Sequence, residues 1–374
     1  MEGILLFLIL AINPGSTSTK ISVFEDKKVL FTEILRHSVS ELSQYKTVSE
    51  QLEFRKNVIL EMLHRKNFSI ERLNAIVGRG GLLKPIKSGT YIVNERMILD
   101  LKEAKRGEHA SNLGGIIAYE LAKNHGIPAF IVDPVVVDEL DDVARITGMP
   151  EIQKSSIFHA LNQKAIGRRL ASDLKKKYED ANIIIAHLGG GISVGAHRHG
   201  YVIDVNDALN GEGPFSPERA GGLPTLELAR LCYSGKYTFE EMKKKVLGGG
   251  GLVAHLKTND VKEVYNMIES GNKRAELILD AMAYKTAKEI GAMAVALNGE
   301  VDAIGITGGI AYNEDFVKRI SSRVNFIAPV YVYPGEDEMQ ALAEGAYRVL
   351  SGGEEAKVYA YRVLSGGEEA KVYE

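Results

Sequence analysis

The residues from Asn13 to Lys20 form a short polar turn that is suited to holding a phosphate group. They read Asn-Pro-Gly-Ser-Thr-Ser-Thr-Lys and follow an apolar run. A glycine and small hydroxyl residues, Ser16 among them, let backbone N–H groups and hydroxyls reach phosphate oxygens, and Lys20 adds a point charge. Asn13 stands at the strand end, where it suits a metal-bound water or a phosphoryl oxygen. The turn also fits an ordinary polar hairpin, and it is not a Walker loop, because the chain contains no GxxxxGK[ST] sequence.

A second turn carries a run of three glycines, Gly189, Gly190 and Gly191, directly after His187-Leu188. Three consecutive glycines at the end of a buried strand cost conformational entropy, so the backbone there must be approached closely. A nucleotide phosphate is the natural ligand. His187 is placed to donate a hydrogen bond to a phosphoryl group in transfer, although a structural histidine at a strand end is the alternative.

A third glycine turn, Thr307-Gly308-Gly309-Ile310, lies between an apolar run and a helical pattern. Ligands of α/β sheets bind at the carboxyl ends of strands, where a helix start can face a nucleotide. This pattern alone indicates nucleotide binding only weakly.

Charged residues follow several of the predicted strands. Arg79 and Arg219 both lie in glycine-bordered loops instead of on helix faces, a setting that a surface arginine rarely needs, although a loop arginine is more often solvated than functional. Asp133 ends an apolar run before Pro134, and a carboxylate at that position suits Mg²⁺. The acidic run from Asp138 to Asp142 is interpreted as a solvated helix start.

Other side chains are interpreted as structural. His197 and His199 alternate along a predicted strand and are expected to face solvent, and no HExxH zinc motif occurs. The single cysteine, Cys232, excludes an internal disulfide, suits a reducing cytoplasm, and is expected to be a small buried apolar residue. The run Ile4–Ile12 lacks the positive charge that precedes a signal peptide and is too short to span a bilayer, so it predicts a buried strand.

The 374 residues suffice for two domains, with 45% hydrophobic and 25% charged residues. A net charge of −3 gives no reason to expect nucleic acid or an anionic membrane as partner. Apolar runs alternate with helical periodicity, which predicts α/β layers. The predicted strands are 75–77, 129–132, 182–186, 301–306 and 326–332, and the predicted helices are 49–66, 112–124, 157–178 and 273–297.

Two features concern the chain as a whole. The strand–turn–strand pattern occurs at Ile9–Val23 and again at Ile183–His197, which indicates a duplicated architecture. At the C-terminus, Tyr347–Tyr359 reads YRVLSGGEEAKVY and Tyr361–Tyr373 repeats it. Two copies cannot occupy one groove, so we expect the first copy to finish a helix and the second to be accessory or poorly packed.

In combination, these segments resemble the acetate and butyrate kinase family, within the actin, sugar kinase and heat-shock chaperone superfamily. Asn13–Lys20 is similar to the family's first phosphate motif, His187–Gly191 to its second, and Gly305–Asn313 to its adenosine motif. The match runs from Ile12 to about Leu350. The segments that resemble the butyrate branch are Gly78–Gly81, Asp133–Val136, Phe158–Lys164 and Pro334–Glu338.

The resemblance implies two RNase H-like (actin-like) domains that form a cleft, with residues 1–135 plus 341–374 in the first and 136–340 in the second. It places Asn13, Asp133 and Glu338 near Mg²⁺, with Arg79 and Arg219 around the carboxylate and the transferring phosphoryl group. His187 would stabilise that group. The resemblance puts Ser16 and Lys20 near phosphates and Asp260, Gly308 and Gly309 near the nucleoside.

The predicted activity is therefore phosphorylation of a short fatty acid, butyrate, by ATP. A carboxylate is already ionised at pH 7 and needs no general base, so neutralising charge and positioning are the main requirements. Acetate, propionate and isobutyrate are alternative substrates. A sugar kinase or a nucleotide-gated sensor of the same fold is a more distant alternative. We expect a cytoplasmic homo-oligomer.

The preferred length of the acid depends on the apolar end of its pocket. The aliphatic residues Leu82, Leu83, Val135 and Val136 lie in the butyrate-branch loops and are candidates for an enlarged apolar wall. They fit a plain hydrophobic core equally well.

Overall fold

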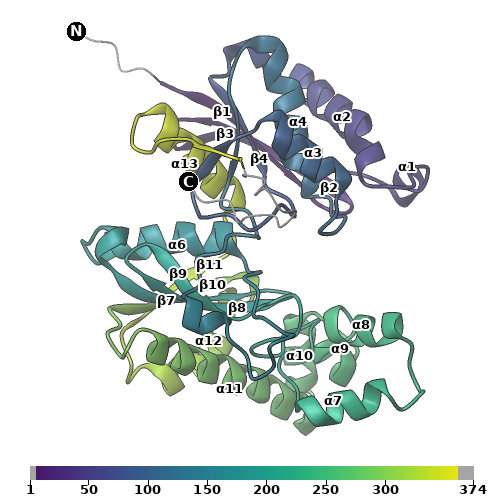
Figure 1. Ribbon diagram of the computed structural model, residues 1–374, viewed down its shortest axis with the longest axis vertical. Coiled ribbons are helices and arrows are strands. Elements are labelled where there is room, and N and C mark those ends of the chain that lie inside the picture. The colour runs from purple at the N-terminus through teal and green to yellow at the C-terminus, as the bar shows by residue number, and fades with distance from the viewer. Residues whose placement is uncertain (1–5, 361–374) are drawn as a thin grey trace. The chain divides into compact units, whose positions relative to one another are not determined.

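A computed structural model describes residues 6–360, in which the chain divides into two α/β units (Figure 1). Unit 1 holds the residues up to Val137 together with those from Asp337 onward, and unit 2 holds Asp138–Glu336. The predicted α/β class and two-domain organisation are confirmed. The predicted boundaries at 135/136 and 340/341 stay a prediction, as does the cleft.

Unit 1 is built on a seven-stranded sheet in the order β12-β5-β6-β4-β1-β2-β3. Strands β1, β2 and β3 form an antiparallel meander, and β4 and β6 continue the sheet parallel to β1. The strands are β1 (Leu8–Pro14), β2 (Ser18–Glu25), β3 (Lys28–Arg36), β4 (Ala75–Arg79), β5 (Thr90–Ile92), β6 (Ala129–Val132) and β12 (Lys357–Val358).

Unit 2 repeats this order with a five-stranded sheet, β11-β10-β7-β8-β9. The meander β7-β8-β9 corresponds to β1-β2-β3, and the parallel pair β10 and β11 corresponds to β4 and β6. The duplicated architecture is therefore confirmed. The strands are β7 (Asn182–Leu188), β8 (Ile192–Arg198), β9 (Tyr201–Val205), β10 (Ala303–Gly308) and β11 (Val330–Pro334).

The apolar strands are buried on both faces. Along β7, Ile183 and Ile185 join a core cluster with Leu170 of helix α6 (Ala160–Asp173) on one side of the sheet. Ile184 and Ala186 join a second cluster beneath two long helices on the other side. Successive side chains of a strand point to opposite faces, so a strand covered on both sides reads as an unbroken apolar run.

Helices cover both sheets. In unit 1, the α-helices are α1 (Val39–Leu42), α2 (Leu52–Arg65), α3 (Glu95–Glu103), α4 (Asn112–Ala122) and α13 (Glu338–Leu350), with 3₁₀ turns at Ser49–Gln51, Ile70–Arg72 and Lys123–His125. In unit 2 they are α5 (Asp142–Arg145), α6 (Ala160–Asp173), α7 (Thr225–Cys232), α8 (Phe239–Leu247), α9 (Gly251–Leu256), α10 (Val261–Glu269), α11 (Lys273–Ala296) and α12 (Glu314–Val324), with 3₁₀ turns at Tyr178–Asp180 and Gly309–Tyr312.

Local capping signals begin several of these helices. Asn272 accepts a hydrogen bond from the Ala275 amide at the start of α11, and Asn313 does the same for Phe316 at the start of α12. α13 returns from unit 2 in sequence and packs on β1, β4 and β6 of unit 1. Within residues 6–360, no helix is long and apolar enough to cross a membrane.

The first copy of the C-terminal repeat does more than finish a helix. After α13 ends at Leu350, the chain adds β12 to the sheet edge beside β5. Lys357 Nζ donates to the Ser88 carbonyl, and Tyr359, which is 1% exposed, donates its hydroxyl proton to Asp100. The second copy, Tyr361–Tyr373, lies outside the described residues.

Three structural interpretations of single residues are wrong. Cys232 is exposed at the end of α7. His197 is fully buried, because β8 is an interior strand covered on both faces. The acidic run does begin helix α5 at Asp142, but Glu139 is buried in an ion pair with Lys164 and is not solvated.

Candidate functional site

The β1–β2 hairpin is supported from behind by a buried arginine of α2. Arg55 is 0% exposed, and its Nη1 donates to the carbonyls of Gly15 (2.9 Å) and Ser18 (3.0 Å). Its Nη2 donates to the Ser16 carbonyl (3.2 Å), and the side chain of Gln51 accepts from both Nε and Nη2. Burial lowers the pKa of Arg55. Among the described residues, no carboxylate pairs with this cation.

These contacts turn the carbonyls of the hairpin inward. Among residues 6–360, the amides of Ser16 and Thr17 have no hydrogen-bond acceptor, so their donors are available to an anion outside the turn. Ser16 is exposed at the tip, and Lys20 pairs with Asn13 across the two strands. The sequence does hold a signal for Arg55, because it occupies the buried stripe of α2 with Ile59 and Leu63.

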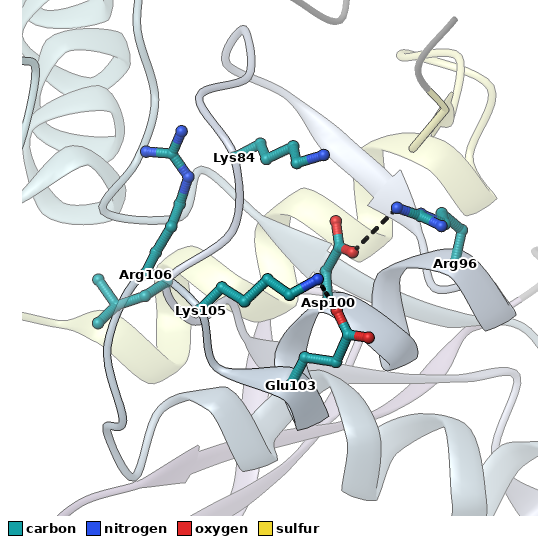
Figure 2. Close-up of a pocket in the computed structure, with 7 residues that line it drawn as sticks. Lys84, Arg96, Asp100, Glu103, Lys105 and Arg106 are labelled. Carbon is teal, nitrogen blue, oxygen red and sulfur yellow. Dashed lines mark ion pairs between the residues drawn. The ribbon is translucent and has the colours of Figure 1, made fainter. Parts of the chain in front are cut away.

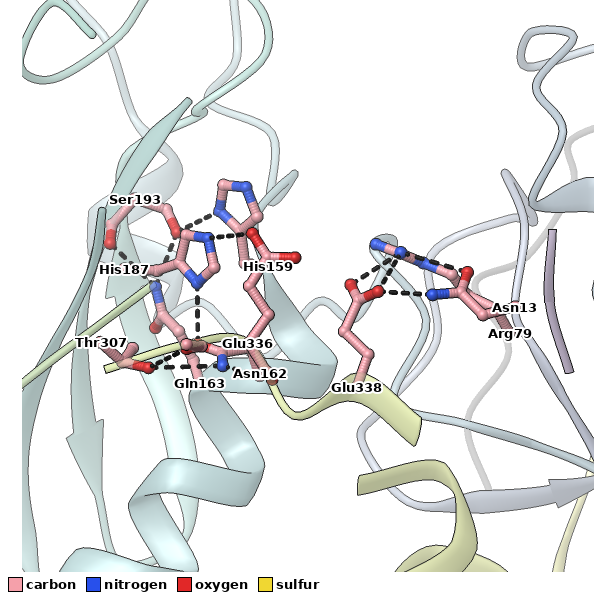
Figure 3. Close-up of polar contacts among 11 residues, drawn as sticks. Asn13, Arg79, His159, Asn162, Gln163, His187, Ser193, Thr307, Glu336 and Glu338 are labelled. Atoms are coloured by element: carbon pink, nitrogen blue, oxygen red, sulfur yellow. Dashed lines mark hydrogen bonds and ion pairs between the residues drawn. The ribbon is translucent and has the colours of Figure 1, made fainter. Parts of the chain in front are cut away.

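Asn13, Arg79 and Glu338 come together within unit 1 (Figure 3). Arg79 Nη1 lies 2.7 and 2.8 Å from the two carboxylate oxygens of Glu338 and 3.4 Å from the Asn13 amide oxygen. Asn13 Nδ2 donates to Glu338 Oε2 at 2.5 Å. The end of β1, the end of β4 and the first residue of α13 supply the three side chains, so residues far apart in sequence form one polar cluster.

Asp133 follows β6 in a strained conformation. Its φ is +37°, which a residue with a side chain rarely adopts, and such strain concentrates at functional positions. The side chain is 1% exposed, and Oδ1 accepts a 2.7 Å hydrogen bond from the Gly89 amide.

The oxygen donors of unit 1 fit a divalent cation that is held largely by phosphate. Asn13 and Glu338 are adjacent, and amide and carboxylate oxygens suit Mg²⁺. Within the described ranges, no three or more His, Cys, Asp or Glu side chains form a metal cluster. Mg²⁺ commonly takes one or two carboxylates and completes its shell with water and substrate phosphates, so the donor set fits a cation that arrives with a nucleotide.

Two imidazoles stack at the end of β7 in unit 2. The rings of His159 and His187 lie 3.8 Å apart and nearly parallel. His187 Nδ1 is 2.8 Å from Asn162 Oδ1, and its Nε2 is 3.7 Å from Glu336 Oε1. His159 Nδ1 is 2.8 Å from the Ser193 hydroxyl. His159 was not among the predicted site residues. His159 lies just before α6, so its proximity to His187 could be predicted only if the strand that α6 packs against were known.

The three glycines make room for side chains of the site itself. A Cβ at Gly191 would lie 2.0 Å from Nη1 of Arg219, and one at Gly189 would lie 3.1 Å from Nε2 of His187. Arg219 is therefore laid across the turn, with Nη1 donating to the Ala208 carbonyl. Burial lowers the pKa of Arg219, and its Nε has no partner among the described residues.

The loop of Arg219 is bonded to the glycine turn through Ser216, whose hydroxyl donates to the Gly190 carbonyl at 2.6 Å and accepts from the Arg219 amide. Gly308 has φ +93°, and a Cβ there would lie 2.3 Å from the Leu188 carbonyl, so this position requires glycine. Gly309 next to it is exposed and open. Asp260 is exposed and caps α10 by accepting from the Lys262 amide.

The predicted residues are divided between the two units, and within unit 1 the side-chain contacts join Asn13, Arg79 and Glu338. Unit 1 holds Asn13, Ser16, Lys20, Arg79, Asp133 and Glu338, and unit 2 holds His187, Gly189, Gly190, Gly191, Arg219, Asp260, Gly308 and Gly309.

A cavity of about 110 Å³ in unit 1 does not provide the expected apolar wall (Figure 2). Apart from Leu82, its lining is charged, with Lys84, Arg96, Asp100, Glu103, Lys105 and Arg106. Leu83 and Val136 are 1% and 3% exposed, which makes them part of the core, the alternative considered for them.

Comparison with known proteins identifies the family of this chain. The Acetokinase family pattern matches residues 152–370. Butyrate kinase 2 of Clostridium acetobutylicum is 58% identical over 353 residues, which cover 94% of this chain and 99% of that protein. A probable butyrate kinase of Clostridium botulinum is 57% identical over 353 residues, 94% of this chain and 99% of that protein. The chain belongs to the acetokinase family.

Solved structures extend this likeness to the fold. The acetate kinase of Porphyromonas gingivalis aligns with a TM-score of 0.74 at 20% identity, covering 91% of this chain and 99% of that one. This likeness confirms the predicted fold, and the family pattern and the butyrate kinase relatives confirm the predicted family. Family membership alone does not test the roles of the individual side chains, which stay predictions.

Proposed function

We propose that this acetokinase is a butyrate kinase, which transfers the γ-phosphoryl group of ATP to the carboxylate of butyrate and releases ADP. Two observations support the proposal. Relatives named butyrate kinase match nearly the whole chain. The geometry adds two half-buried arginines: Arg79 at the end of β4 is held by Glu338, and Arg219 beside the glycine turn is held by the Ala208 carbonyl. The second observation carries the chemistry.

The reaction joins two anions, and no proton needs to move. An oxygen of the butyrate carboxylate attacks the γ-phosphorus, and the bond from that phosphorus to the β,γ-bridging oxygen breaks, leaving the electron pair on ADP. Butyrate is ionised at neutral pH, so no general base is required. The obstacle is repulsion between the carboxylate and the γ-phosphate, which the guanidinium groups of Arg79 and Arg219 are proposed to offset.

The hairpin and the glycine turns are proposed to hold the nucleotide. The amides of Ser16 and Thr17, with Lys20, would donate to phosphate oxygens. Gly189–Gly191 would admit the phosphate chain, and Gly308, Gly309 and Asp260 would contact the nucleoside.

Asn13, Glu338 and Asp133 are the residues that would hold Mg²⁺. When bound, the ion supplies positive charge that neutralises phosphate oxygens. In this arrangement Arg79 has a second function, because its contact with both Glu338 oxygens orients that carboxylate.

The stacked imidazoles are proposed to contact the transferring phosphoryl group. His187 was predicted for this role, and the stacking at 3.8 Å adds His159 to it. We further propose that the enzyme works in the cytoplasm as a homo-oligomer, with carboxylic acid and ATP or ADP as its small-molecule partners.

The test is acyl-hydroxamate formation from ATP and a series of acids from acetate to hexanoate, including isobutyrate. Each buried methylene contributes about 0.8 kcal/mol, roughly fourfold in affinity. Two methylenes separate butyrate from acetate, so butyrate or isobutyrate should exceed acetate by about tenfold or more in kcat/KM. An optimum at acetate would refute the substrate but not the kinase, whereas no hydroxamate from any acid would refute both.

A further inference from the structure

A chain of buried polar side chains leads away from His159 in unit 2, and Figure 3 shows its first two members, Ser193 and Gln163. Gln163 of α6 contacts the Ser193 hydroxyl with Nε2 at 2.8 Å and the Ser193 carbonyl with the same atom at 3.0 Å. Its Oε1 is 3.0 Å from His197 Nε2, and His197 Nδ1 is 2.6 Å from the Tyr178 hydroxyl. Gln163, Ser193 and His197 are all 0% exposed.

The direction of these hydrogen bonds is fixed by one backbone group. The Ser193 carbonyl can only accept, so the Gln163 atom that faces it must be the amide nitrogen. The Gln163 oxygen then faces His197, whose Nε2 must donate to it. Burial, followed by the charges of Lys164 and Arg168, holds the pKa of His197 well below its ordinary value, so His197 is neutral and its Nδ1 accepts from Tyr178.

This direction determines where His159 carries its proton. The Ser193 hydroxyl accepts from Gln163 and has one proton to donate, and His159 Nδ1 is the acceptor at 2.8 Å. If Nδ1 carried a proton instead, the buried hydroxyl proton of Ser193 would lose that acceptor, which is unfavourable. A neutral His159 therefore has its proton on Nε2.

The same reasoning gives His187 the opposite tautomer. Asn162 Nδ2 faces the Glu336 carbonyl at 2.9 Å, so the Asn162 oxygen faces His187 Nδ1, which must donate. A neutral His187 then has an unprotonated Nε2, and it gains a second N–H only as an imidazolium beside the Glu336 carboxylate. Because two imidazolium ions stacked at 3.8 Å would repel each other, at most one ring is charged.

We propose that Gln163 is a positioning residue that fixes the His159 proton on Nε2, so that His159, and not neutral His187, supplies the N–H donor of the stacked pair. The inference rests on the proposed function in that this donor serves the transferring phosphoryl group. It reassigns to His159 a role that the sequence suggested for His187.

The decisive variant is Gln163→Glu, which replaces the donating NH₂ by an oxygen at nearly constant shape. The introduced carboxylate, when ionised, accepts the Ser193 hydroxyl proton, so the Ser193 oxygen becomes the acceptor for an Nδ1–H of His159. We would label the histidines with ¹⁵N and read both tautomers from two-bond ¹H–¹⁵N spectra above neutral pH, assigning signals with His159→Gln. We expect Nε2–H in the wild type and Nδ1–H in the variant, with His187 unchanged because Asn162 sets its proton.

Kinetics then separate positioning from general damage. Loss of a donor to the reacting group should lower kcat by about 10²- to 10³-fold, with KM for ATP changed less than threefold. Ser193→Ala, which removes the donor without adding charge, should leave His159 as a mixture of tautomers and lower kcat in the same direction. Asn206→Asp is the matched control, because Asn206 is equally buried and bonds the same strand β8, yet contacts neither histidine.

Wild-type His159 with its proton on Nδ1 would overturn the proposal, and so would a Gln163→Glu variant whose tautomer and kcat both match the wild type. If Gln163→Glu does not fold, the wild-type spectrum and Ser193→Ala still decide the question. Failure of the proposed function is distinct from these outcomes, since it would appear as a wild-type enzyme that forms no acyl hydroxamate while its tautomers remain as described.

Discussion

The substitution Gly191→Ala should displace the Arg219 guanidinium, although it replaces no ionisable residue. A Cβ at Gly191 would lie 2.0 Å from Nη1 of Arg219 and 2.6 Å from its Cζ. Ordinary contacts begin at 3.4 Å, so the guanidinium must move by about 1.4 Å. The backbone of Gly191 does not require glycine, because its φ lies outside the left-handed region. The effect should therefore come from the displaced side chain alone.

The size of the effect follows from that displacement. A misplacement of about 1 Å in a positioning group costs roughly 10²-fold in rate. We therefore expect kcat/KM for Gly191→Ala to fall by about 10²-fold, which is ~2.7 kcal/mol. Arg219→Ala removes the charge-stabilising contact entirely and should fall by about 10²- to 10³-fold.

A double-mutant cycle in the hydroxamate assay tests whether the two changes act through one group. In an Arg219→Ala background the alanine at position 191 no longer meets the guanidinium, so the double variant should match Arg219→Ala. The coupling energy should approach the whole cost of Gly191→Ala, about 2.7 kcal/mol. Gly222→Ala in the loop of Arg219 is the control, because a Cβ at Gly222 would lie 3.6 Å from the Gly213 carbonyl oxygen, which is an ordinary contact.

Two results would refute this reasoning. One is a Gly191→Ala enzyme within threefold of wild-type kcat/KM, which would mean that Arg219 need not occupy its described position. The other is a double variant whose losses multiply, which would mean that the glycine serves the ligand directly. Thermal unfolding of all four proteins shows whether any loss reflects instability.

Four further predictions concern unit 1. Arg79→Ala should lower kcat/KM by a few orders of magnitude with little change in Tm, since a charge-stabilising contact is worth roughly 3 kcal/mol; near-normal rates would exclude Arg79 from the site. Asp133→Asn should shift the Mg²⁺ dependence of kcat, and an unaltered dependence would reject a metal role. Deleting Ala360–Glu374 should leave activity and Tm nearly unchanged, whereas a deletion from Ser351 should lower Tm because it also removes β12; a large loss from the shorter deletion would show that the second repeat docks. Arg55→Met should leave inward-facing hairpin carbonyls without a donor and lower kcat more than tenfold, measured well below Tm, and equal rates would show that the hairpin holds its shape without it.

The sequence predicted those parts of the site that are written in neighbouring residues. Both hairpins follow from an apolar run, a glycine or hydroxyl turn and a second apolar run, and the structure has them as β1–β2 and β7–β8. The strand ends that carry Arg79 and His187 follow from the same signals. These are local patterns, so they survive without knowledge of what packs against them.

The parts that were missed depend on tertiary burial. His197 was expected at the surface because its strand alternates with polar residues, yet both faces of β8 are covered. Alternation of polar and apolar residues indicates an exposed face only where one side of the sheet is open to solvent, and it does not indicate exposure in a strand covered on both faces. The prediction for Cys232 was wrong in the opposite direction. Cysteine is usually buried, but helix α7 has no buried residue.

The run Gly189–Gly191 was predicted to be part of the site, but the reason given for its glycines was incomplete. Its glycines were interpreted as access for a ligand, but the first atoms that a Cβ at Gly191 would meet belong to Arg219 of the same chain. Close approach of either a side chain or a phosphate requires a residue without Cβ, so the sequence cannot distinguish the two. In the structure, the Arg219 side chain is one reason why position 191 is glycine.

The two sheets share their strand order, but different side chains support their hairpins. The duplication can therefore be recognised from the topology and not from the sequence motifs. The β1–β2 turn is backed by the buried cation of Arg55, whose hydrogen bonds turn the carbonyls inward. The end of β7 and start of β8 are backed by an uncharged set of hydrogen bonds from Gln163 and Asn162 of α6. A cation favours an anion in front of it, whereas an uncharged network fixes which nitrogen of a histidine donates. The two hairpins therefore share strand order and use it differently, and the residues that make the difference lie on helices outside both motifs.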